Sequence, residues 1–265
     1  MHSLILWLYW IPSWVLGVLI FAVFSTIATA GLLTFRGWMR RHVHRANDLV
    51  FNFVAIAGIV YALAVGLIAV ATWDKFKAVQ EIVNAEAYSL NNLYSDASGL
   101  PTDSATMVRN EIRGYLDFVL KKEWPSQQHG SEAQTKVGDD LAQGILQDVV
   151  YANAKTPHET VLLAQALGEL NTFLAKRRAR EGALNEALPG VLYFLVLGGA
   201  AILIFMTYAL WTEEFWLQIA MTLALSAMIS LVIFMIVSMD HPLWGPVSAS
   251  PEAFENVLKA IQRQP

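Results

Sequence analysis

The chain has 265 residues, of which 55% are hydrophobic and 15% are charged, and its formal net charge is −4. A soluble domain normally carries about 25% charged residues, so much of this chain requires an apolar solvent, and the lipid bilayer is that solvent. The negative balance argues against nucleic acid as a partner. The absence of cysteine excludes disulfides and thiolate chemistry.

The first apolar segment, Met1 to Phe35, contains no Lys, Arg, Asp or Glu. Aromatic side chains favour the headgroup zone of a bilayer, and they are frequent before Pro12. Pro12 therefore separates an interfacial start from a span of about residues 14–35. A basic loop with four arginines, the last of them Arg45, follows this span. We interpret the loop as a positively charged membrane anchor.

The second apolar segment begins at Asn47 and Asp48, either of which can cap a first helical turn. It runs over residues 49–73 without a charged residue and continues without Gly or Pro to Leu93. About 25 apolar residues are more than a bilayer core of about 30 Å requires. Small residues at every fourth position predict a close contact with another helix, with Tyr61 beside it. The predicted helix-packing residues are Gly58, Ala62, Gly66 and Tyr61.

The start of this second span is polar, with Asn52 about one turn inside the helix. Two interpretations of Asn52 remain open, an interhelical hydrogen bond or a polar ring at a pore mouth. In an oligomer, Asp48 would lie beside four arginines of each subunit, so a ring of subunits would favour anions. The candidates for the pore and its mouth are Arg45, Asn47, Asp48 and Asn52.

Residues 74–187 are predicted to form a soluble helical domain inserted between the second and third spans. The segment 98–101 breaks its first helix. A second helix begins near Thr102 and ends before Pro125, a third follows, and Thr156-Pro157 begins the fourth. Alternation typical of β-strands is absent from the region, so its fold is expected to be all-α.

A second transmembrane hairpin covers residues 188–239, with spans of about 188–211 and 216–239, and complements the first hairpin of residues 1–73. Residues 240–265 form a turn and an amphipathic helix, which is expected to lie on the membrane or on the bundle. A carboxylate at Asp240 opposes the macrodipole of the last span. We expect an arginine, or backbone N–H groups of the following turn, to hold it, and the binding of an ion or ligand is the alternative. The complete prediction is an all-α integral membrane protein with four transmembrane helices.

Two charge signals for the orientation of the helical domain disagree. An uncharged N-terminal segment followed by four arginines places the domain outside the cytoplasm, in the periplasm if the membrane is a bacterial inner membrane. Four basic residues before the third span favour the opposite orientation. Because the first helix usually dominates, we expect a periplasmic domain. The four basic residues are Lys176, Arg177, Arg178 and Arg180.

Motifs for phosphate binding, zinc binding or nucleophilic catalysis are absent from the sequence. A proton-driven pump normally needs a carboxylate or histidine deep in a span, and the spans contain none. We therefore expect no enzymatic activity, no cofactor and no metal site.

Several short motifs occur together between about residues 45 and 254. They include Asn47-Asp48, Gly58, Tyr61, Gly245 and Ser250–Phe254, and the remaining positions are Glu86, Arg109, Tyr115, Glu123, Trp124, Pro125, Asp240, His241 and Pro242. As a set they resemble the bestrophin-like family of bacterial and plant membrane proteins. The resemblance implies the two-plus-two span layout of bestrophin anion channels. Those channels are pentamers whose second span lines a hydrophobic neck and whose middle region is cytosolic.

Two functional hypotheses follow. The leading one is an oligomeric channel-like membrane protein that conducts chloride or another anion. The alternative is a non-conducting membrane scaffold or sensor whose helical domain binds a partner. The expected partners are membrane lipid and further copies of the chain.

Overall fold

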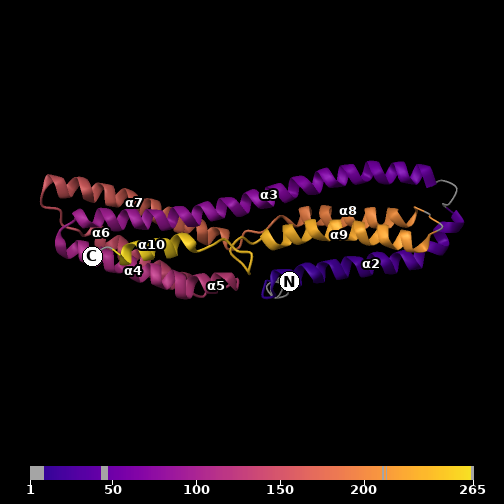
Figure 1. The fold of residues 1–265 in the computed structure, drawn as a ribbon. Coiled ribbons are helices and arrows are strands. Elements are labelled where there is room, and N and C mark those ends of the chain that lie inside the picture. The colour runs from indigo at the N-terminus through magenta and orange to yellow at the C-terminus, as the bar shows by residue number, and fades with distance from the viewer. Residues whose placement is uncertain (1–8, 43–46, 211, 213, 264–265) are drawn as a thin grey trace. The chain divides into compact units, whose positions relative to one another are not determined.

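The computed structural model describes residues 9–42, 47–210, 212 and 214–263, and every regular element in these ranges is helical (Figure 1). Within them, four helices are long and apolar enough to cross a membrane. The expectation of an all-α membrane protein with four candidate spans is therefore confirmed. These segments are Ser13–Gly37, Asp48–Gly99, Gly190–Tyr208 and Phe215–Met239.

The chain divides into two compact units. The membrane unit comprises residues 11–74 and 187–240, and the helical unit comprises residues 75–186 and 241–265 together with the start of the chain. Helix α3 (Asn47–Asp96) contributes its apolar half to the membrane unit and its amphipathic half to the helical unit. The other helices of the membrane unit are α2 (Ser13–His42), α8 (Gly190–Tyr208) and α9 (Phe215–Met239).

In the membrane unit, α2 packs along most of α9 and also contacts α8 (Figure 1). Gly17 of α2 lies beside Phe234 of α9, where a Cβ would make an ordinary van der Waals contact of 3.6 Å with the ring. Buried apolar side chains such as Leu32, Ile204 and Ile233 fill the space between the three helices. The apolar part of α3 is the least buried of the four candidate spans.

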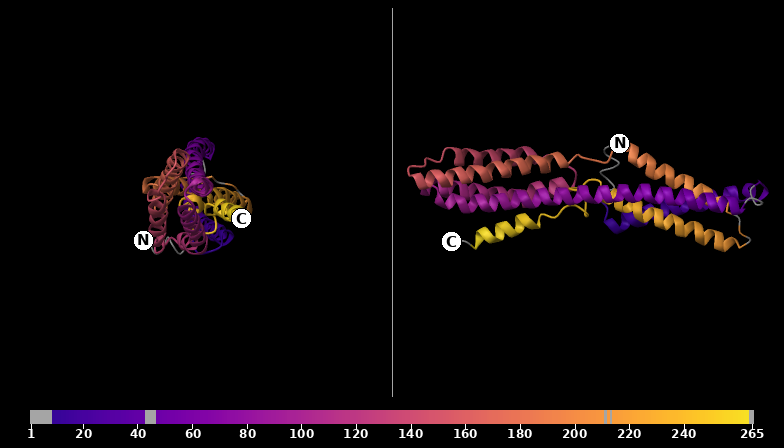
Figure 2. Two further views of the ribbon diagram at one scale, coloured as in Figure 1. Left: turned by 90° about the vertical axis from the view of Figure 1, so that its left-hand side faces the viewer. Right: turned by 90° about the horizontal axis from the view of Figure 1, so that it is seen from above.

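The helical unit is a bundle of the second half of α3 with α4 (Thr102–Phe118), α6 (Thr135–Val150) and α7 (Pro157–Ala183) (Figure 2). A short turn, η2 (Ala97–Gly99), separates α3 from α4, where the sequence predicts a break. The last helix, α10 (Glu252–Gln262), packs against α4. Its apolar side chains Phe254, Val257 and Ile261 are buried there, so the amphipathic C-terminal helix lies on the bundle.

The helix that begins at Thr102 does not end before Pro125, and that prediction was wrong. Helix α4 is followed directly by a π-helical turn, η3 (Val119–Glu123), and by α5 (Trp124–Gln128). In the wide turn the N–H of Trp124 donates to the carbonyl of Val119, five residues earlier. Pro125 then occupies the first turn of α5, where a missing N–H costs nothing. The chain therefore stays helical through the proline.

Candidate functional site

A cluster of ion pairs is buried in the helical unit, and we call Glu86, Glu123, Arg177 and Arg180 the buried ion cluster. Arg180 of α7 lies with Nε 2.6 Å from Oε2 of Glu86, on α3, and with Nη2 3.3 Å from Oε2 of Glu123, in η3. Arg177, one turn earlier, places Nη1 and Nη2 each 3.1 Å from Glu123. The side chains are at most 2% exposed. Two carboxylates face two guanidinium groups, so the charges balance.

Tyr115 of α4 connects the two halves of the cluster. Its hydroxyl donates to Oε1 of Glu86 over 2.7 Å and accepts from Nη1 of Arg177 over 2.8 Å. Burial, aided by the charge of Glu86, raises the pKa of Tyr115 well above its ordinary value, although Arg180 and Arg177 oppose the shift. The phenol therefore stays neutral at physiological pH, which is the form that can donate to Glu86.

The guanidinium groups stay charged despite their burial. Burial lowers the pKa of Arg180, but the carboxylates of Glu86 and Glu123 more than offset that effect, and the net pKa is raised. Nη1 of Arg180 also donates to Oε1 of Gln127 over 2.7 Å. A buried charge is tolerated only when it is paired and hydrogen-bonded, and Arg180 meets both conditions.

Two further carboxylates lie at the rim of the cluster. Nη2 of Arg177 is 3.2 Å from Asp139, on α6, and 2.6 Å from Glu181, one turn later on α7. Burial raises the pKa of Glu181 to about 7, and the nearby Asp139 adds to the rise, while Arg177 opposes it. The rim therefore holds a carboxyl group that changes its charge near neutral pH.

Arg177 and Arg180 are the residues that sequence reasoning interpreted incorrectly. Their position shortly before the third span suggested membrane anchors, yet both are buried in ion pairs within the helical unit. A signal was present, because residues 170, 173, 177 and 180 fall on one face of a helix. Leu170 and Phe173, on that same face, are fully buried. Extending the apolar face by two turns would have placed both arginines inside the bundle.

The contacts of the buried ion cluster indicate a structural role. Over the described residues, no group of three or more His, Cys, Asp or Glu side chains is arranged to hold a metal ion. Its hydrogen bonds join α3, α4, η3, α6 and α7. The buried ion cluster therefore connects the helices of the bundle to one another.

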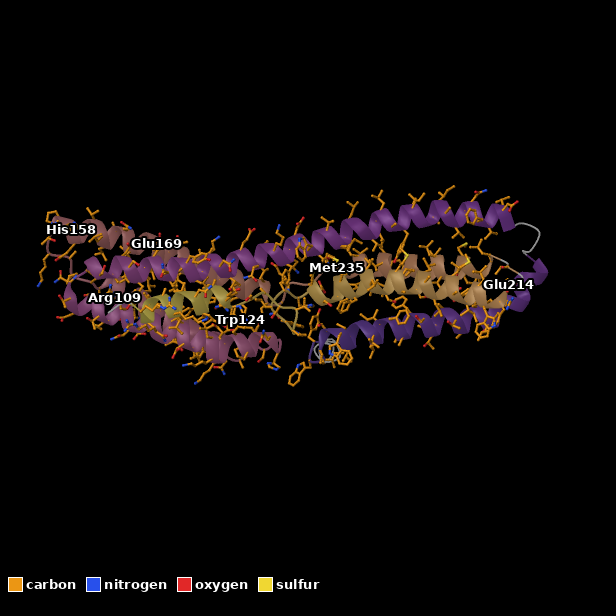
Figure 3. The ribbon with its side chains drawn as sticks, in the orientation of Figure 1. Arg109, Trp124, His158, Glu169, Glu214 and Met235 are labelled. Atoms are coloured by element: carbon orange, nitrogen blue, oxygen red, sulfur yellow. The ribbon has the colours of Figure 1, made fainter. Side chains whose placement is uncertain are left out.

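Arg109 and Trp124 lie outside the buried ion cluster, on different helices of the same unit (Figure 3). The Arg109 guanidinium carbon lies 4.8 Å from the ring centroid of Tyr94, and its Nε donates to the Tyr94 carbonyl. Trp124 is 3% exposed and packs near Phe254, with ring centroids 6.1 Å apart. Trp124 is thus a core residue that anchors α10 to the bundle.

His241 and Pro242 shape the turn that precedes α10. The ring of His241 stacks on Trp244 with centroids 4.0 Å apart, and its Nδ1 lies 3.1 Å from the hydroxyl of Tyr9. The carbonyl of Pro242 accepts from the N–H of Ala249. Gly245 has φ +71°, a conformation that favours glycine, and a Cβ there would stand 3.1 Å from the backbone oxygen of Tyr9.

Asp240 is held by groups at the start of α8. Its Oδ1 accepts from the N–H of Leu188 over 2.6 Å, and its Oδ2 accepts from the hydroxyl of Tyr193 over 2.8 Å. These two donors lie outside the expected set of an arginine and the N–H groups of the following turn. The N-terminal end of a helix favours negative charge, which accounts for a carboxylate at this place.

The pore-mouth candidates are only partly described. Asp48 and Asn52 are exposed on α3, Asn47 is its first residue, and Arg45 lies outside the described residues. Neither Asp48 nor Asn52 lines the cavities that α3 forms with α8 and α9 over the described residues. Their role at a mouth therefore stays a prediction about an assembly.

The small-residue face of α3 is open within the chain. A Cβ at Gly58 or Gly66 would meet no atom within 4 Å, and Ala62 is exposed, so none of the described helices packs closely there. Tyr61 does make a contact, because its hydroxyl donates to the Val196 carbonyl over 3.0 Å and its ring lies against Gly199. The predicted close contact with another helix would have to come from a second copy.

Comparison with known proteins gives the family. A model described as a bestrophin-like domain matches residues 10–254. The chain belongs to the bestrophin-like family. The crystal structure of a membrane protein aligns over 94% of this chain and 99% of that chain, with a TM-score of 0.64 at 9% identity. At that identity the likeness shows the fold alone. No curated protein matches the chain.

Three of the positions that carried the bestrophin-like resemblance come together in the helical unit. Glu86, Tyr115 and Glu123 meet in the buried ion cluster. Asp240 lies in the membrane unit, while His241 belongs to the helical unit. In the described part of this bestrophin-like chain, the motif residues thus serve mainly to hold helices and turns in place.

Proposed function

We propose that this bestrophin-like protein is an oligomeric membrane channel that conducts anions, with the apolar half of α3 facing the ion path. Bestrophins are anion channels, and the family assignment covers nearly the whole chain. The observation that carries the proposal is the exposure of α3. Only 11% of its apolar window is buried, against 33% for α9.

The exposed face of α3 has the composition of a hydrophobic constriction. Ile59, Leu63 and Leu67 recur at every fourth residue and are 70%, 66% and 65% exposed. Repeated around an axis, such a stripe would form an apolar neck, which passes ions only when water fills it. Asn52 and Asp48 lie about two and three turns before Ile59, where a polar mouth would precede the neck.

Current recording from purified protein in planar bilayers tests the proposal. A chloride gradient should give a reversal potential of the sign expected for anions. Leu63→Ser should raise the conductance, because a hydroxyl in the neck favours wetting. Leu231→Ser is the matched control, since Leu231 of α9 is 68% exposed but lies on another helix. Absence of current in every lipid and at every voltage would contradict the channel proposal.

A non-conducting scaffold is the second candidate. It is favoured by apolar side chains on the surface of the helical unit around the α6–α7 connection, where Tyr151 is 82% and Val161 is 66% exposed. Such residues suit a protein partner. A protein that gives no current but loses a bound partner on Tyr151→Ser and Val161→Ser would support this function.

We propose further that residues 74–187 form a soluble domain inserted between the second and third spans, outside the cytoplasm of a bacterium. The burial of Arg177 and Arg180 supports this orientation, because charges neutralised inside the bundle do not act as membrane anchors. Of the four basic residues before the third span, only Lys176 and Arg178 remain as evidence for the opposite orientation.

A further inference from the structure

A groove runs along the membrane unit between α3 and α9. It consists of two cavities, of about 350 and 390 Å³, which share Leu225. On α9 the lining residues run from Gln218 to Met235, and Figure 3 labels Met235. Successive lining residues are one or three positions apart, so they lie on one face of the helix. On α3 the lining begins at Phe51 and ends at Ala69. The two stripes run in the same direction, which makes the cavities successive parts of one groove.

The middle of the groove is apolar and open because α3 presents small residues there. Gly58, Ala62 and Gly66 line the second cavity, and neither glycine leaves a Cβ any atom to contact within 4 Å. Met228 and Val232 form the opposite wall. A lipid acyl chain placed in this groove would bury its apolar surface, which is favourable. A polar segment placed there would lose its hydrogen bonds to water.

The first cavity differs, because three of its polar side chains present acceptor oxygens and one of these is buried without a partner. Gln218 is 3% exposed, its Nε2 donates to the Leu210 carbonyl, and its Oε1 accepts no hydrogen bond. Thr207 and Thr222 already donate their hydroxyl hydrogens to the carbonyls of Ile204 and Gln218. The oxygens of these side chains are left to accept. A ligand that satisfies Oε1 of Gln218 must bring a hydrogen-bond donor.

We propose that the groove binds a phospholipid with a primary ammonium headgroup, such as phosphatidylethanolamine. The ammonium donates to Oε1 of Gln218 at the acceptor-lined end, and one acyl chain lies along the groove over Gly58 and Ala62. The length of the groove agrees with the length of an acyl chain in one leaflet. Gln218 and Met228 are ten residues apart on α9, which is about 15 Å along the helix. One leaflet is half of a hydrocarbon core of about 30 Å.

Retention of lipid by the purified full-length protein tests the proposal. The protein is exchanged into micelles containing equal amounts of phosphatidylethanolamine and phosphatidylcholine with identical acyl chains, and native mass spectrometry counts the bound lipid. The two lipids differ only at the headgroup nitrogen, which carries three N–H donors in phosphatidylethanolamine and three methyl groups in phosphatidylcholine. A charged hydrogen bond that is lost corresponds to a preference of about tenfold for phosphatidylethanolamine. Gln218→Met should abolish this preference without abolishing lipid binding.

Two matched variants test the path of the acyl chain. Met228→Trp fills the groove and should reduce binding of both lipids, while Leu231→Trp should leave binding unchanged. Both residues lie on α9 and are similarly exposed, at 67% and 68%, but only Met228 lines the groove.

Three outcomes would overturn the assignment. One is equal retention of both headgroups by the wild-type protein, and another is equal binding by the two tryptophan variants. The third is efficient cross-linking between copies through a cysteine at Ala62, which would show that a second protein chain occupies the groove. None of these measurements requires ion conduction, so the lipid site and the channel proposal can fail separately.

Discussion

Gly138 of α6 lies directly against Arg177 of α7, so that a Cβ on the glycine would stand 2.5 Å from Nη2 of the arginine and 3.0 Å from Oε1 of Glu123. The absence of a side chain at this one position lets α6 approach the buried ion cluster. The contact explains why a residue with poor helix propensity occupies the interior of α6.

Gly138→Ala should therefore destabilise the protein, although alanine usually stabilises a helix. Overpacking a well-packed site costs about 1–3 kcal/mol, and the displaced partner here is a charged group with fixed hydrogen bonds. Thermal unfolding in detergent measures the effect. Gly168→Ala on α7 is the control, because nothing lies within 4 Å of a Cβ there, and it should be neutral or stabilising. Equal effects of the two substitutions would show that the α6 contact is loose.

Removing one partner of the buried ion cluster should be far more damaging than removing a surface charge. Arg180→Met leaves Glu86 buried without its cation, while Glu123 keeps its pair with Arg177, and the cost should be about 3–5 kcal/mol. Lys121→Met breaks only the exposed pair with Asp117, which is worth less than about 1 kcal/mol. Chemical denaturation of both variants provides the comparison. A mild effect of Arg180→Met would mean that water enters the cluster.

Stability should depend on pH through Glu181. Because its pKa is raised from 4.5 to about 7, the folded protein holds a proton that the unfolded chain has already released between these pH values. The contribution of Glu181 to stability is therefore greatest at acidic pH and is lost as the pH rises through about 7. Because of Glu181, the melting temperature of the wild-type protein should decrease as the pH is raised from 5 to 8.

Glu181→Gln isolates that dependence, since it keeps the shape but cannot ionise. The variant should show a flatter melting profile between pH 5 and pH 8 than the wild type. Asp117→Asn, which removes an exposed carboxylate of α4, should leave the slope as it is. A wild-type slope that persists in Glu181→Gln would assign the titration to another group.

The proposed orientation predicts labelling from outside the cell. Tyr151→Cys introduces a thiol at a position that is 82% exposed in the helical unit, and the chain has no other cysteine. A thiol reagent that cannot cross the membrane should label intact cells. Labelling only after lysis would instead place the unit in the cytoplasm.

The helix boundaries could largely be predicted, because they depend on local chemistry. At Thr156-Pro157 the hydroxyl of Thr156 accepts from the N–H of Glu159, while the carboxylate of Glu159 accepts from the N–H of Thr156. Such a cap is visible in four consecutive residues. The π-helical turn before Pro125 was not predictable in this way. It depends on packing that carries Trp124 into the core, and a proline alone favours a helix end.

The candidate site was less predictable, because its members lie on distant parts of the chain. Glu86 and Arg180 are 94 positions apart, and nothing in the sequence fixes which carboxylate meets which arginine. In the sequence, Glu86 and Glu123 were two positions of one motif set, and nothing fixed their separation. The fold brings both to one guanidinium, and this shared cation is a property of tertiary structure alone.

The contact of Asp240 with the start of α8 closes a loop in the membrane unit. Helices α8 and α9 are joined covalently between Tyr208 and Phe215, and at the other end by the Asp240 hydrogen bonds to Leu188 and Tyr193. Because the two helices are connected at both ends, they cannot separate at one end while they stay together at the other. A change in bilayer thickness would therefore tilt α8 and α9 together as one plate, and Asp240→Ala would free each helix to tilt at its own angle.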